Sequence, residues 1–471
     1  MKKLAVLLLA AGMVLGSMQG VSHAVDVNIS GEWDFNGEWN DTSFTKHDGD
    51  DHFKARQRMR TQVDIVASEN LSGTVQFETN LDWGNGGENL AGEGGGALGS
   101  DGCNVLTRYA YMDWTIPAID VKVRMGLQPL SLPNYVGGDV ILGSDDAIAG
   151  GVTLSYEFNE NVSATLFWSR FECDGNGDEW GNNFDLFGLS IPITGDGFDM
   201  AVWGLYANMG KSSMTTNGDD GLEFKNEYLS AGLLPVGVEA DVEFEDSYSA
   251  AWWVGFGGEV TALDPLRLAL DFSYGRADWG ESADGTMDLT REGFMISATA
   301  EYAMEEMTPG LVLWYSSGDD DDPYNGSERM PTICPSWAPT SLAWDGGYGI
   351  SDCDLLGVTP TGTWGIVARL ADISYIEDLS HTLAVAYYTG TNDKAMADFV
   401  GDPRLDSGIY LTEDDHAFEV NFDTTYQIYE NLTLCVELGY LHLDLDGDTW
   451  GDTSEIEKDA YKIGINFTYA F

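Results

Sequence analysis

The sequence predicts an all-β protein, a transmembrane antiparallel β-barrel of about 18 strands, with 16 as the other possible count. Three observations predict this fold. Apolar and polar residues alternate over segments of ten or more residues, the apolar faces carry aromatic residues toward the segment ends, and short turns alternate with long Gly- and Asp-rich connections. In outer-membrane barrels alternate residues face lipid and lumen, short turns lie on the periplasmic rim, and long loops lie outside.

The composition excludes two other classes of protein. The 471 residues include 78 Asp and Glu against 22 Lys and Arg, a formal charge of -56. Such a chain repels a phosphate backbone, so it is not a nucleic-acid binder. It is also 43% hydrophobic and 12% aromatic, which is too apolar for an intrinsically disordered acidic chain.

The first 24 residues have the pattern of a secretory signal peptide. Lys2 and Lys3 precede an apolar run from Leu4 to Leu15, and small residues stand at the cleavage positions Ser22 and Ala24. We therefore expect residues 1–24 to be removed on export and residues 25–471 to form a single barrel. No later stretch has the ~18 continuous apolar residues of a spanning helix, so we expect the chain to enter the bacterial outer membrane as strands.

Strand segments follow one another to the end of the chain. From Val25 to Trp39 the odd positions are apolar or glycine and the even positions are polar, which is the period of a strand with one apolar face. A soluble sandwich also alternates, but its strands average five or six residues, shorter than these segments. The pattern returns at 266–274, 418–428, 432–440 and 461–471.

The connections set the strand count. Eight short turns alternate with nine long connections, which implies about 18 strands with both termini on the periplasmic rim. The uncertain region is 208–249, where Tyr228 to Val238 is apolar without clean alternation. A loop helix, an extra strand and an inward fold all remain open for it.

Basic residues gather on one face of the segment from Phe53 to Ala67. Lys54, Arg56, Arg58 and Arg60, here called the basic column, would each cost ~2 to 4 kcal/mol near the midplane of the lipid face, so they must face the lumen. Alternate residues of a strand stand roughly 7 Å apart, which gives a column about 20 Å long. Lys122 and Arg124 are predicted to add to it from the next part of the wall.

These six residues are a large share of the 20 basic residues that follow the signal. We interpret them as a field placed across a channel. The simpler alternative is that they neutralise acids of the lumen.

The segment from Pro129 to Gly150 combines many apolar residues with Asp139, Asp145 and Asp146. Because so apolar a loop would be poorly solvated outside, we predict that residues 129–150 fold into the barrel, narrow it and turn their acids toward the basic column. The alternative is an apolar loop used in subunit contact.

Several runs resemble the homotrimeric outer-membrane porin family of sulfate-reducing bacteria, within the general porins. The matching runs are Gly126–Pro129, Leu132–Pro133, Tyr324–Pro331 and Asp372–Asp393, with the terminal Phe471. The resemblance implies a homotrimer of separate water-filled pores, passive diffusion of small hydrophilic solutes and ions, and an inward third loop. The other partners that we expect are outer-membrane lipid and lipopolysaccharide.

Two other functions are compatible with a barrel. One is a receptor or adhesin with a closed lumen. The other is an outer-membrane hydrolase, which has little support because none of the five histidines after the signal stands in a nucleophile or zinc-ligand pattern. No cofactor is expected.

Two acidic stretches show part of the spacing of a calcium-binding loop. Glu179 and Trp450 break the required pattern, so a solvated acidic loop is the simpler interpretation. Divalent cations held there would bridge lipopolysaccharide or subunits. The candidate ligands are Asp174, Asn176 and Asp178 in the first stretch and Asp446, Asp448 and Glu457 in the second.

The five cysteines lie in an exported chain, where bridges form. Cys334 and Cys353 share one long connection, so we predict a disulfide between them. Cys103 and Cys173 would pair if their two loops touch. Cys435, on the polar face of its strand, is predicted to remain a thiol in the lumen.

Overall fold

The structure is a computed structural model. It describes residues 25–40, 52–85, 95–99, 104–143, 145–173, 183–210, 215–217, 222–224, 227–238, 248–282, 285–351, 353–405, 408–451, 453, 456 and 458–471. The predicted signal peptide, residues 1–24, lies outside this range.

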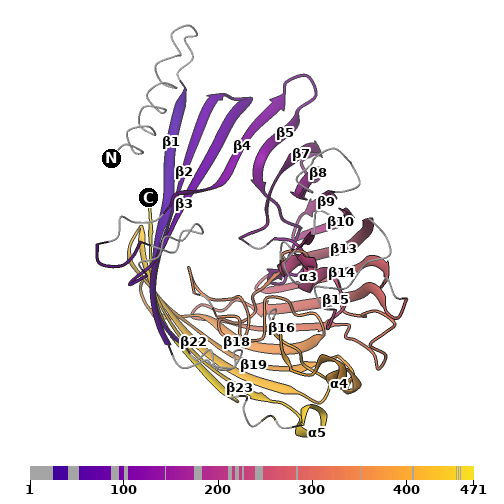
Figure 1. The fold of residues 1–471 in the computed structure, drawn as a ribbon. Helices are drawn as coiled ribbons and strands as arrows, with labels where there is room; N and C mark the ends of the chain where they lie inside the picture. Colours follow the sequence, from indigo (N-terminus) through magenta and orange to yellow (C-terminus); the bar gives the residue numbers. More distant parts are fainter. Residues whose placement is uncertain are drawn as a thin grey trace.

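Eighteen strands of the described chain form one closed antiparallel sheet (Figure 1), which confirms the predicted fold and the higher strand count. Each strand pairs with its neighbour along the chain, and β1 pairs with β24 to close the ring. The strands are β1 (Asp26–Asn40), β2 (His52–Ser68), β3 (Leu71–Asp82), β4 (Leu106–Ile116), β5 (Val121–Pro129), β7 (Ile148–Asn159), β8 (Val162–Glu172), β9 (Phe184–Gly195), β10 (Phe198–Gly210), β13 (Tyr248–Leu263), β14 (Leu266–Glu281), β15 (Asp288–Tyr302), β16 (Thr308–Ser316), β18 (Thr363–Ile376), β19 (Leu379–Gly390), β22 (His416–Tyr429), β23 (Leu432–Asp444) and β24 (Asp459–Ala470).

The connections alternate as the sequence predicts. Eight turns of two to five residues lie on one rim, and nine connections of six or more residues lie on the other. We call these the short-turn rim and the long-loop rim. The chain end closes the barrel near the short-turn rim, because the backbone of Phe471 exchanges two hydrogen bonds with Gly31 of β1, at 2.9 and 3.0 Å.

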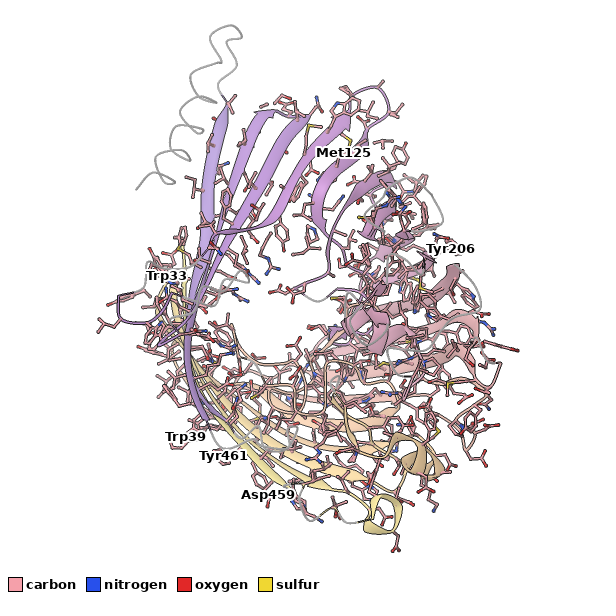
Figure 2. The ribbon with its side chains drawn as sticks, in the orientation of Figure 1. Trp33, Trp39, Met125, Tyr206, Asp459 and Tyr461 are labelled. Carbon is pink, nitrogen blue, oxygen red and sulfur yellow. The ribbon has the colours of Figure 1, made fainter. Side chains whose placement is uncertain are left out.

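The outer face of the barrel is apolar. Trp39 of β1 and Tyr206 of β10 are 49% and 48% exposed, and both are marked on the wall in Figure 2. Such aromatic side chains near the strand ends suit the two membrane interfaces. No helix in the described part of the chain has the length and apolar character to cross a membrane.

Shorter elements lie within the long connections. The region left open by the sequence contains the helix α3, one of the three structures considered for it, and the hairpin of β11 and β12. The pair β6 and β17 joins two loops inside the barrel, and α4 and α5 lie at the long-loop rim (Figure 1). Their bounds are β6 (Gly138–Asp139), β11 (Thr215–Asn217), β12 (Leu222–Phe224), α3 (Glu227–Leu233), β17 (Ser336–Trp337), η2 (Lys394–Met396), α4 (Ala397–Val400), β20 (Arg404–Leu405), β21 (Gly408–Ile409) and α5 (Gly447–Trp450).

A hydrophobic core fills one side of the barrel interior. Trp253 of β13 and Tyr388 of β19 are fully buried beneath residues of the inward connections, including Trp337 and Trp344. The ring of Trp344 packs edge-on against Tyr388, with centroids 5.7 Å apart. The lumen-facing side of β1 to β5 carries polar residues instead. The polar side of the barrel interior is therefore the side of β1 to β5.

Candidate functional site

The basic column lies on the lumen face of β2. Its neighbours in sequence, such as Phe53 and Ile65, are the exposed residues of the outer face, so the even-numbered residues point inward as the alternation predicts. Register places Arg56, Arg58 and Arg60 opposite polar residues of β1 and β3. The strand therefore places the four cations along one line of the wall.

Carboxylates flank the column on both sides. Arg58 approaches Asp34 of β1 at 3.3 Å, and Arg60 contacts Glu78 of β3 at 2.6 Å. Lys54 lies 3.6 Å from Asp82. The wall therefore carries alternating charges rather than a purely positive surface, which agrees with the alternative that the column balances lumen acids.

Arg108 of β4 is a further member of this wall that sequence reasoning missed. It is 8% exposed and donates to Glu78 at 2.8 Å, beside Arg60. A register shift between Gln76 and Phe77 of β3 interrupts the regular pairing with β4 at this point. Because alternation breaks at such a shift, the sequence pattern did not identify Arg108 as a lumen residue.

Lys122 and Arg124 also face the lumen, but they form a separate group. Arg124 donates to both oxygens of Asp113 in β4, at 2.8 and 2.9 Å, and Lys122 lies 3.2 Å from the same carboxylate. They lie nearer the short-turn rim than Arg108, so they do not extend the basic column itself.

The connection between β5 and β7, within the segment 129–150, reaches across the barrel interior to β14. At its far end Asp271 of β14 accepts hydrogen bonds from the backbone of Tyr135 and Val136, at 2.9 and 2.8 Å. At its base Leu130 bonds to the backbone of Ala147 at 2.8 Å. We call residues 130–147 the first inward loop.

The three acids of this loop take different positions. Asp145 contacts Arg60 at 2.6 Å and lies 3.9 Å from Arg58, so it faces the basic column. Asp146 is exposed beside it. Asp139 does not face the column, contrary to prediction, because the loop carries it across the lumen to the side of Asp271. Burial there, with the charge of Asp271, raises the pKa of Asp139 to about 6, although a hydrogen bond with Asn134 opposes the shift.

A second connection, residues 317–362 between β16 and β18, also folds into the barrel. Glu419 of β22 is fully buried and accepts hydrogen bonds from the backbone of Leu342 and Ala343, both at 3.2 Å. Lys462 of β24 is equally buried and donates to the carbonyl of Ser341 at 2.7 Å. We call this segment the second inward loop. Its Trp and Leu residues signalled burial, but the sequence did not show that the burial was inside the barrel.

The two inward loops meet each other and the basic column. They pair through β6 and β17, and the N–H groups of Ile333 and Cys334 both donate to the carbonyl of Ile141, at 3.0 and 2.9 Å. Arg58 lies 3.9 Å from Asp145 of the first loop and 3.4 Å from the carbonyl of Gly349 in the second. Arg58, the first inward loop and the second inward loop are therefore joined in a ring by three contacts: Arg58 with Asp145, β6 with β17, and Arg58 with Gly349. We call this arrangement the loop ring.

The predicted bridge between Cys334 and Cys353 is not formed. Cys334 lies beside the first inward loop, whereas Cys353 is buried at the wall near β1. The Cys353 thiol donates to Glu38 at 3.4 Å and accepts from Asn40 at 3.1 Å. Burial, with the charge of Glu38, raises the pKa of this thiol. Cys435 is a buried thiol on the lumen side of β23, as predicted, and Cys103 lies outside the described residues.

The second calcium candidate has a structural use. Asp446 caps α5, accepting hydrogen bonds from the N–H and hydroxyl of Thr449 at 2.8 and 2.7 Å, and Asp448 stands in the first turn of that helix. The described residues contain no group of three or more His, Cys, Asp or Glu that would hold a metal ion. The other candidate ligands, Asp174, Asn176, Asp178 and Glu457, lie outside the described residues.

One histidine has an acidic neighbour, as a hydrolase would require. His442 lies 2.8 Å from Asp459. Its sequence neighbours Leu441 and Leu443 are buried inside the barrel, so this pair faces outward at the long-loop rim. The pair is therefore not placed to act on a solute within the lumen.

Comparisons with known proteins identify the fold. No protein-family model and no curated protein matches the chain. Among solved structures, OccAB1 of Acinetobacter baumannii has 12% identity and a TM-score of 0.55, over 97% of this chain and 99% of that one. OccK9 (OpdG) of Pseudomonas aeruginosa has 12% identity and a TM-score of 0.54, over 95% and 98%. OpdK of the same species, solved with vanillate, has 9% identity and a TM-score of 0.51, over 94% and 98%.

These neighbours are OprD/Occ outer-membrane porins. They do not confirm the resemblance to the homotrimeric porins of sulfate-reducing bacteria. The chain has the 18-stranded barrel fold of an outer-membrane porin.

Proposed function

We propose that this protein is an outer-membrane porin, a water-filled channel for passive diffusion of small hydrophilic solutes and ions. The loop ring is the observation that carries the proposal. A closed-lumen receptor has no need of a polar wall enclosed by two anchored loops, whereas a channel needs a fixed constriction lined by charge. The constriction is the ring formed by Arg58, Asp145, the β6–β17 pair and Gly349.

A liposome-swelling assay with a modifiable residue tests this proposal. Arg58→Cys, treated with a bulky thiol-specific reagent, should slow the entry of a small sugar, because the added group stands in the constriction. The matched control is Met200→Cys on the outer face, where 38% exposure permits labelling without reaching the lumen. The wild-type chain treated in the same way measures any effect of the native cysteines. Equal swelling of labelled Arg58→Cys and its unlabelled form would refute this constriction.

We also propose a homotrimer, exported with cleavage after residue 24, on the strength of the sequence resemblance and the pattern of the first 24 residues. Pairing around the closed barrel satisfies the strand backbone groups within the membrane, so a subunit should resist detergent. An unheated sample on an SDS gel should migrate as a trimer and dissociate on heating. Migration as a monomer in both samples would contradict the trimer without affecting the channel.

We propose that acidic residues of the long-loop rim contact lipopolysaccharide through divalent cations. We also propose that the channel holds no cofactor. Removal of divalent cations by a chelator should then weaken lipopolysaccharide binding and leave the barrel folded. The proposal includes no catalysis, and the structural neighbours are channels.

A further inference from the structure

The first strand of the barrel extends beyond the strand that closes it. The pairing of β1 with β24 begins at Glu32, and Phe471 bonds to Gly31, so residues 26–30 of β1 have no neighbour on that side within the described chain. Five residues of a strand span about 17 Å. In Figure 1 the start of β1 lies well beyond the mark at the C-terminus. We call residues 26–30 the open edge.

Backbone groups of the open edge point away from β2. Gly31 exchanges two backbone hydrogen bonds with Phe471, at 2.9 and 3.0 Å. Because backbone groups alternate between the two sides of a strand, the N–H and C=O groups of Val27 and Ile29 point to the same side as those of Gly31. The pairing with β2 uses the other side. Two donors and two acceptors are therefore available to a further strand.

The open edge lacks the features that usually protect a free sheet edge. Such edges carry charged residues, proline or a bulge, which prevent pairing with another chain. Here the two residues whose backbone faces the open side are Val27 and Ile29, and their side chains are 46% and 63% exposed. The register of this segment with β2 is regular. The edge is therefore suited to the addition of an extended segment.

The open edge lies on the periplasmic side of the lipid boundary. Phe471, at the level of Gly31, and Tyr429, in the neighbouring hairpin, are 43% and 68% exposed. Exposed aromatic side chains of this kind mark the lipid interfaces of an outer-membrane barrel, and its short turns face the periplasm. Residues 26–30 continue from this boundary toward the short-turn rim. A polypeptide in the periplasm can therefore reach them.

The surroundings of the open edge are acidic. Each of the eight short turns contains at least one exposed Asp or Glu, and none contains Lys or Arg. Glu69 stands in the turn after β2, beside the open edge, and Glu430 stands in the turn that adjoins the end of β24. Asp26 lies in the edge itself. A surface whose charges have one sign attracts a partner of the opposite sign.

We propose that the open edge binds an extended basic segment of a periplasmic polypeptide, which adds a strand beside β1. The backbone of the segment pairs with Val27 and Ile29, and its apolar side chains lie beside theirs. Its Lys or Arg residues alternate with these and lie on the face of Asp26, near the acids of the short turns. This inference goes beyond the channel function and needs only that the barrel lies in the outer membrane.

Two matched peptides test the open edge by fluorescence anisotropy on the purified full chain in detergent. The probe is a labelled seven-residue peptide that alternates Lys with Val. The control probe carries N-methyl groups on its Val residues, which removes the backbone donors that face β1 and keeps every charge. The unmethylated probe should bind saturably and about tenfold more tightly than the methylated one, because each lost hydrogen bond weakens binding.

Hydrogen exchange locates the bound probe. The outward amides of Val27 and Ile29 should exchange freely in the protein alone and slowly when the unmethylated probe is bound, because pairing protects them. The turn at 196–197, on the opposite side of the barrel, should keep its exchange rate.

Two variants complete the experiment. Ile29→Pro removes an outward donor and leaves the pairing with β2 in place, so it should weaken binding about fivefold. If that variant fails to fold, Glu69→Gln, Glu430→Gln gives a second measurement, since the loss of two acids beside the edge should weaken binding. The matched control is Asp196→Asn, Glu305→Gln, which removes two acids from short turns on the opposite side of the barrel and should have a smaller effect.

Three results would overturn the proposal. One is equal affinity for the methylated and unmethylated probes. Another is binding without protection of residues 26–30. The third is protection of these residues in the absence of probe that increases with protein concentration, because the occupant would then be a second copy of this chain. None of these results depends on whether the barrel conducts.

Discussion

Neutralising the basic column should move the ion selectivity of the channel toward cations. In Lys54→Gln, Arg56→Gln, Arg58→Gln, Arg60→Gln the wall loses four positive charges, while its acids stay in place. Two of those acids, Glu78 and Asp145, lie 2.6 Å from Arg60 and would lose that partner. A permeating cation would then meet carboxylates that the column now balances.

Coulomb's law gives the size of this effect. Two unit charges at 4 Å interact by about 1 kcal/mol in bulk water and by about 4 kcal/mol at an effective dielectric constant of 20. Even the lower value, for one released carboxylate, changes the permeability ratio of K⁺ to Cl⁻ roughly fivefold. In a tenfold KCl gradient this shifts the reversal potential of a previously unselective channel by about 30 mV, where ideal selectivity gives about 59 mV.

A planar bilayer measures this shift directly. The control is Arg369→Gln, because this arginine pairs with Glu301 away from the loop ring. That variant should give a smaller shift. An unchanged reversal potential in the quadruple variant would refute the assignment of the column to the constriction, provided that circular dichroism shows a folded barrel.

Three further predictions concern the loops. Glu419→Ala should raise single-channel conductance and cost about 3 kcal/mol, because it removes a buried acceptor that holds the second inward loop; unchanged conductance would contradict that anchoring. The folded pKa of Asp139, about 6, exceeds the unfolded value of 3.8, so its contribution to stability is full below pH ~4 and is lost as pH rises through ~6, by up to ~3 kcal/mol. Thermal midpoints at low and neutral pH should therefore differ less in Asp139→Asn, and an equal difference would contradict this. Peptide mapping without reduction should find Cys353 alkylated after unfolding, whereas a peptide linking it to Cys334 would show that the bridge forms.

The fold could be predicted because alternation has a simple physical cause. A strand between lipid and a polar lumen must alternate, and the position of Arg58 or Trp39 follows from parity along the strand. Arg108 escaped the same reasoning because a register shift disturbs parity beside it. The direction of a side chain could therefore be predicted only where the alternation of the strand is unbroken.

The loop contacts could not be predicted because they join residues far apart in the chain. The apolar character of residues 129–150 indicated burial, but not that the loop reaches Asp271 of β14 and carries Asp139 with it. In the same way, proximity along the chain suggested a bridge between Cys334 and Cys353, whereas Glu38 and Asn40 of β1 hold Cys353 at the wall. Such placements depend on three-dimensional packing, which no local pattern encodes.

Single-channel recording of the purified full chain in KCl shows whether the barrel conducts through its polar wall. We expect discrete, stepwise conductance that persists at low voltage, because the inward loops are anchored to the wall at Asp271 and Glu419. A folded protein that inserts into the bilayer and gives no conductance would contradict it, and would favour a receptor with a closed lumen.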